Sequence, residues 1–67
     1  MPSSVIRSFF YDGRRRRLDV RFVSGRRYSY LEVPPEVYDR MKAAFSKGEF
    51  FNAEIRDRFR FIRDEQS

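Results

Sequence analysis

The 67-residue sequence contains no cysteine, no histidine and no tryptophan, and it has only three glycines and three prolines. Without cysteine, a disulfide, a thiolate nucleophile and a cysteine-type zinc site are all excluded. Without histidine, the commonest general base is missing, and the carboxylates show no metal-ligand spacing. We therefore expect neither catalysis nor a bound cofactor or metal.

Long apolar runs are also lacking. No stretch approaches the ~20 residues of a membrane-spanning helix. The start of the chain, Met1-Pro2-Ser3-Ser4, has neither the basic residues nor the apolar segment of a secretory signal. We expect a soluble, cytoplasmic protein, and the lack of cysteine is compatible with a reducing compartment.

Large aromatic side chains are plentiful. Eight Phe and four Tyr can each bury roughly 150–250 Å². A chain this short is otherwise marginal, because it buries only about 60% of its unfolded surface. One domain is therefore predicted, over residues 4–63, with a polar tail at residues 64–67.

The charge is unbalanced toward arginine. Fifteen Lys and Arg oppose ten Asp and Glu, which gives a net charge of +5, and thirteen of the fifteen cations are Arg. The planar guanidinium suits phosphate and stacks on bases, unlike the ammonium of lysine. A GC-rich genome also enriches arginine, so composition leaves both explanations open.

Alternating apolar residues predict three strands joined as an antiparallel meander. Asp12-Gly13 and Ser24-Gly25 are turn signals between them. Pro34 cannot donate a hydrogen bond to a neighbouring strand, so the third strand is expected to end before it. The predicted strands are Val5 to Tyr11, Leu18 to Phe22 and Arg27 to Val33.

A helical pair is predicted next. Pro35 fits the first turn of a helix, and Gly48 is expected to end that helix in a left-handed conformation. The apolar stripe of this helix comprises Val37, Tyr38, Met41, Ala44 and Phe45. Glu49 to Arg56 is expected to form a second, shorter helix.

A last short strand is expected within Asp57 to Arg63, where Phe59 and Phe61 alternate with arginines. The predicted fold class is therefore α+β. It consists of a three- or four-stranded antiparallel β meander followed by a helical pair packed on one sheet face.

Two tyrosines, Tyr28 and Tyr30, admit two interpretations. A three-residue loop with Gly25 in the left-handed region pairs Val20 with Tyr28, so both rings face the core. A two-residue loop shifts the register by one and moves them to the polar face, where they can stack on bases. The glycine at the third loop position favours the core interpretation.

Several of these motifs together resemble the KTSC domain family. They are Tyr28-Ser29-Tyr30, Pro34-Pro35 and Gly48-Glu49-Phe50-Phe51-Asn52. The resemblance runs from about Ser4 to Phe59. It implies a small bacterial domain that also occurs at the C-terminus of some lysyl-tRNA synthetases, with RNA or tRNA binding as a suggested role.

The arginines suggest where RNA would bind. The run Arg14 to Arg17 departs from the mixed polar turn that is usual in the family. Together with residues near the next turn, it is predicted to form a basic edge that attracts phosphates, although a merely solvated loop explains the run equally simply. The candidate nucleic-acid-binding residues are Arg14, Arg15, Arg16, Arg17, Arg21, Arg26, Arg27, Tyr28 and Tyr30.

The alternative to RNA is a protein partner. An exposed sheet edge, or exposed members of the Phe9-Phe10 and Phe59-Phe61 pairs, would offer a docking surface. The first strand is apolar on both faces, so one face requires a cover from the C-terminal segment or from another chain. If the C-terminal segment docks on its own chain, the protein is expected to be a monomer.

Overall fold

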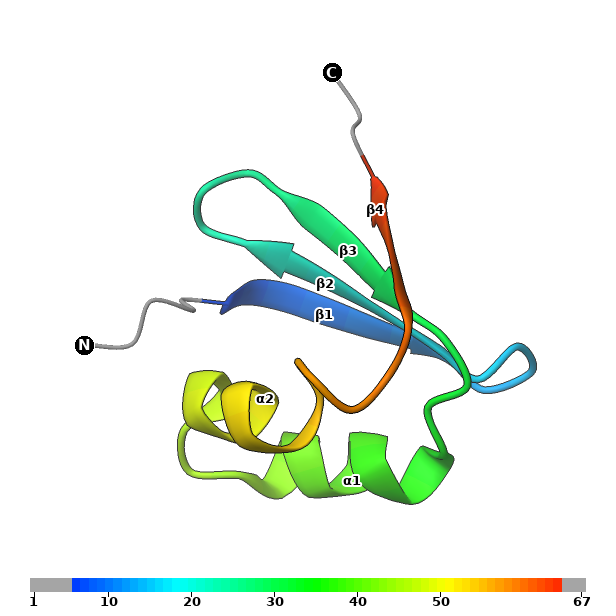
Figure 1. The fold of residues 1–67 in the computed structure, drawn as a ribbon. Coiled ribbons are helices and arrows are strands. Elements are labelled where there is room, and N and C mark those ends of the chain that lie inside the picture. Colours follow the sequence, from blue (N-terminus) through cyan, green and yellow to red (C-terminus); the bar gives the residue numbers. More distant parts are fainter. Residues whose placement is uncertain (1–5, 65–67) are drawn as a thin grey trace.

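The computed structural model describes residues 6–64, so Ser4 and Val5 lie outside the described residues. Four strands form one antiparallel sheet in the order β1-β2-β3-β4, and both helices lie on one of its faces (Figure 1). This arrangement confirms the α+β prediction. The elements are β1 (Ile6–Asp12), β2 (Arg17–Phe22), β3 (Arg27–Tyr30), α1 (Pro35–Ala43), α2 (Lys47–Glu54) and β4 (Phe61–Asp64).

The turn between β2 and β3 sets the register of the sheet. Gly25 has a φ of +99°, and the backbone N–H of Phe22 donates to the carbonyl of Arg26 at 2.9 Å. Val20 then pairs with Tyr28. The three-residue loop and the register that follows from it are confirmed, and both tyrosines face the helices.

The core lies between the sheet and the two helices. Phe51 of α2 is buried, and its ring is nearly perpendicular to that of Tyr30, at 5.3 Å between centroids. Tyr11 of β1 stacks on Tyr38 of α1 at 4.7 Å. The fully enclosed apolar residues are Leu18, Val20, Tyr30, Val33, Met41, Phe51 and Ile55.

The third strand ends at Tyr30, three residues before the predicted end at Val33. Glu32 has a φ of +56°, which bends the chain out of the sheet. The N–H of Val33 then donates to the carbonyl of Arg16 at 2.8 Å, so it bonds to the β1–β2 turn and not to a neighbouring strand. The bend therefore occurs before the prolines are reached.

The prediction that Gly48 ends the first helix is wrong. Helix α1 ends at Ala43, and Ala44 is already extended. Ser46 caps α2, because its hydroxyl accepts from the N–H of Glu49 at 3.2 Å, and Gly48 falls inside the first turn of that helix. The glycine is not in the left-handed region.

Phe45 was expected on the buried stripe of α1, and this is also wrong. The residue lies in the connection between α1 and α2, and its side chain is fully exposed. The stripe stops at Met41, which is completely buried, because the helix ends before another turn can bring Phe45 to the same face.

The fourth strand is confirmed, although it begins at Phe61 and not at Asp57. It pairs with β3, so that Phe61 lies opposite Tyr30. The strand extends to Asp64, one residue into the predicted tail. Residues 65–67 lie outside the described part of the chain.

Candidate nucleic-acid interface

Within residues 6–64, no helix or loop covers the sheet face opposite α1 and α2 (Figure 1). We call this surface the open face. Side chains alternate between the two faces of a strand, and Phe10 pairs with Asp19 while Asp19 pairs with Ser29. By the same alternation, the positions on the open face are Ser8, Phe10, Asp12, Arg17, Asp19, Arg21, Arg27, Ser29, Ile62 and Asp64.

The open face is hollowed. A shallow cavity of about 300 Å³ lies over β1, β2 and β3. Its lining combines three guanidinium groups, one carboxylate, two hydroxyls and one exposed aromatic ring. These groups belong to Ser8, Phe10, Arg17, Asp19, Arg21, Arg27 and Ser29.

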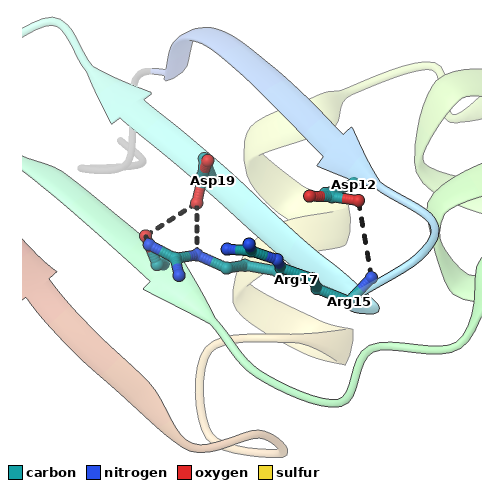
Figure 2. A network of polar contacts seen from close by, with 5 residues as sticks. Asp12, Arg15, Arg17 and Asp19 are labelled. Atoms are coloured by element: carbon teal, nitrogen blue, oxygen red, sulfur yellow. Dashed lines mark hydrogen bonds and ion pairs between the residues drawn. The ribbon is translucent and has the colours of Figure 1, made fainter.

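A polar network holds one of these arginines in place. Asp19 Oδ1 accepts from the Ser29 hydroxyl at 2.7 Å and from Arg17 Nε at 3.3 Å. Arg17 Nη2 also donates to Ser29 Oγ at 3.4 Å. Figure 2 shows Arg17 and Asp19 on the open face, with the helices behind the sheet. Asp19 therefore neutralises Arg17 and fixes its direction along the sheet.

A second pair of arginines is arranged differently. Arg21 and Arg27 are direct cross-strand partners, and like charges in that position destabilise a sheet. Arg21 is exposed, and its side chain makes no hydrogen bond or ion pair with the side chain of any other described residue. On its other side Arg27 has Asp64 of β4 as its cross-strand partner, whereas Arg21 lies between Ser8 and Arg27 with no acidic residue opposite it. A bound anion would offset the positive charge of Arg21, so this end of the hollow suits a phosphate.

Three of the four consecutive arginines, residues 14–16, lie in the β1–β2 turn, and Arg17 begins β2. Asp12 Oδ1 accepts from the backbone N–H groups of Arg14 at 3.1 Å and Arg15 at 3.4 Å, the latter drawn in Figure 2. Arg16 adopts a φ of +53°. Because the turn is held by its backbone, the side chains of residues 14–16 are left exposed to solvent.

The predicted arginines do not gather at a single edge. Successive turns of an antiparallel meander lie at opposite ends of the shared strand, and the six residues of β2 span roughly 20 Å. Arg26 is therefore at the far end from Arg14. Arg17, Arg21 and Arg27 lie between the two turns, so the basic groups form a strip across the open face.

Tyr28 and Tyr30 lie on the other face. Tyr30 is only 3% exposed, and burial raises the pKa of its phenol to about 12. Tyr28 is half-buried and stands at 5.6 Å from Phe22, ring centroid to ring centroid. The structure thus places both rings with the core and apart from the arginines of the open face.

The phenylalanines predicted as a docking surface for a protein partner differ in their exposure. Phe9 and Phe59 pack against the core, whereas Phe61 and Ile62 of β4 are each about half exposed. Phe45 is exposed on the segment that connects α1 to α2. In the sheet order, β1 and β4 are the edge strands.

The described residues hold no group of three or more side chains arranged to bind a metal. Among the same residues, neither helix has the length and apolarity required to cross a membrane.

The fold and the sequence agree with one family. Residues 2–59 match the KTSC domain family. The chain belongs to that family. A crystal structure of a KTSC domain protein from Yersinia pestis superposes with a TM-score of 0.82 and 35% identity, over 94% of this chain and 92% of that one. A protein of Tsukamurella paurometabola is 45% identical over 62 residues, which are 92% of each sequence.

A longer relative is a lysine–tRNA ligase of Nostoc punctiforme, 41% identical over 58 residues. The matched region is 87% of this chain but only 10% of the ligase. This KTSC domain therefore corresponds to a small part of that enzyme.

Proposed function

We propose that this KTSC domain is a non-catalytic module that binds RNA, with tRNA as the favoured form. The observation that carries the proposal is the open face, which no helix or loop of the described residues covers and which is hollowed and lined by Arg17, Arg21 and Arg27. The similarity to part of a lysine–tRNA ligase supports an RNA partner and the predicted cytoplasmic location.

Phosphates are the chemical group that the strip of arginines fits. Guanidinium groups bind phosphate oxygens with two parallel hydrogen bonds, and the exposed Arg14 and Arg15 extend the positive surface beyond the end of β2. Contacts of this kind orient the RNA but carry little sequence information. Binding is therefore expected to depend strongly on salt and weakly on sequence.

The test is a titration of the protein against labelled tRNA, single-stranded RNA and duplex DNA, followed by fluorescence anisotropy. If about five phosphates of a single strand are engaged, raising salt from ~50 to ~200 mM weakens binding roughly a hundredfold. Absence of binding to all three at ~50 mM would overturn the proposal.

A protein partner is the second candidate, favoured by the exposed Phe61 and Ile62 beside the edge of β4. An open strand edge with apolar neighbours can pair with a strand from another chain. Sedimentation at micromolar concentration tests one form of this function. The RNA-binding proposal expects a monomer, and a stable dimer would favour the protein-interaction candidate.

A further inference from the structure

Phe10 is the one large aromatic ring among the side chains that line the open face within the described residues. Its side chain is 64% exposed. Its neighbours in sequence, Phe9 and Tyr11, already pack against the core from the other face of β1. The ring of Phe10 therefore leaves apolar surface in water without contributing to the packing of the domain.

The position of Phe10 relative to the arginines is set by the register. Its direct partner on β2 is Asp19, so Arg17 and Arg21 are its two diagonal neighbours, at roughly 7–8 Å. Ser8, two residues before it, lies opposite Arg21. One hollow thus brings together an exposed ring, two guanidinium groups and a hydroxyl.

Charge divides this hollow into two ends. Asp19 neutralises Arg17 at 3.3 Å, so this ion pair gives its end of the hollow no net positive charge to attract phosphate. Arg21 and Arg27 stand opposite each other on the next row of the sheet, and both line the hollow. Asp64 follows Arg27 on the same row, so Arg21 is the cation that has no acidic residue opposite it. An anion is therefore directed to the Arg21–Arg27 end, with Phe10 beside it.

We propose that the hollow receives one unpaired nucleotide of a single-stranded RNA, its base stacked on Phe10 and its phosphate held by Arg21 and Arg27. This inference rests on the proposed function and names the form of RNA that the site takes. In a duplex, the faces of the bases are covered by stacking, so only a splayed base can lie on an aromatic side chain. Stacking accepts any base, because every base has a π face.

The first experiment uses the protein itself as a probe. The chain has no tryptophan, so Phe10→Trp introduces a single reporter at the proposed contact. A non-self-complementary RNA decamer is expected to quench the tryptophan emission on binding, whereas the same decamer annealed to its complement is not. Equal quenching by both forms would overturn the inference.

The second experiment removes the ring. Phe10→Thr introduces a β-branched residue suited to a strand, and the exposure of the site predicts little change in melting temperature. Loss of one stacked base weakens binding of the single-stranded decamer by between about fivefold and a hundredfold. Binding of the duplex and the salt slope are expected to be unchanged, because no charge is altered.

Phe45→Ala is the matched control. It removes an exposed phenylalanine from the segment that connects α1 to α2, which does not line the hollow. It is expected to leave both affinities unchanged. If RNA binds Phe10→Thr as tightly as the unaltered protein, the stacking inference is overturned while RNA binding stands. If neither RNA form binds the unaltered protein at low salt, both the inference and the proposed function are overturned.

Discussion

Arg21 and Arg27 face each other directly across β2 and β3 on the open face of the sheet. A cross-strand pair of like charges costs stability, in contrast to the Arg17–Asp19 ion pair one row away. On its other side Arg27 has Asp64 of β4 as its partner, so Arg21 is the cation of this row that has no acidic residue opposite it. We interpret the pair as a phosphate site.

Replacing Arg21 by threonine tests separately the effect of the arginine pair on stability and its effect on RNA binding. The repulsion is removed and a strand-forming residue is introduced, so the free energy of unfolding is expected to rise by a few tenths to about 1 kcal/mol. The plot of log affinity for single-stranded RNA against log salt should become shallower by about 0.7, the contribution of one phosphate. Chemical denaturation and anisotropy titrations measure the two effects, and an unchanged salt slope would speak against a phosphate contact at Arg21.

The exposed turn provides a second test. Changing Arg14 and Arg15 to serine leaves the Asp12 hydrogen bonds intact, because these are made by backbone N–H groups. Stability should stay within about ±0.5 kcal/mol, while the salt slope for RNA should become shallower by about 1.4.

The matched control for this variant changes Arg40 and Lys42 to alanine, which removes the same charge from α1. Their ion pairs with Glu54 and Asp39 are exposed and contribute little to stability. Since α1 covers the opposite face of the sheet, the salt slope is expected to be unaltered. Equal effects of the two double variants would show that only net charge matters.

Alkaline pH should destabilise the domain through Tyr30. Burial raises the pKa of this phenol from its usual 10.0 to about 12, so the folded state favours the neutral form. The difference in pKa contributes roughly 2–3 kcal/mol to the free energy of unfolding. This contribution is fully present below about pH 10 and is lost between about pH 10 and pH 12. Tyr30→Phe keeps the ring and removes the titrating group. Its unfolding free energy, measured by urea denaturation, should fall less steeply over this range, and an equally steep fall would contradict the assignment.

The turn that sets the register is expected to be sensitive to substitution. Gly25→Ala places a side chain at a φ of +99°, which costs about 1–2 kcal/mol in the left-handed region. Gly13→Ala is the control, because Gly13 lies outside that region and its new methyl group would meet Tyr11 at an ordinary 3.7 Å. Thermal unfolding of the two variants should therefore differ, and equal melting temperatures would contradict the role of Gly25.

The sheet was predictable because its signals are local. The alternation of Leu18, Val20 and Phe22 and the position of Gly25 together determine which residues pair across β2 and β3. The helix boundary was not predictable from Gly48 alone, because a competing signal lies beside it. Ser46 and Glu49 have the spacing of a capping box, and the hydroxyl of Ser46 starts α2 before the glycine is reached.

The candidate site was only partly predictable. The spacing of Arg17 and Arg21 places them on one face of a strand, as the structure confirms. The Asp19–Ser29 contact requires the register of β3. The exposure of Phe10 depends on which face the helices cover, and in an apolar first strand the sequence pattern is the same for either face.

The central claim is that RNA binds the open face through its arginines. The most direct measurement follows the side-chain Nε–Hε signals of the ¹⁵N-labelled protein in NMR spectra while a single-stranded RNA decamer is added. Arg17, Arg21 and Arg27 lie on the open face, and their signals are predicted to shift together as the RNA is titrated, while the signal of Arg40 on α1 stays in place. Shifts confined to Arg40 and the helices, with the open-face signals unmoved, would contradict the account.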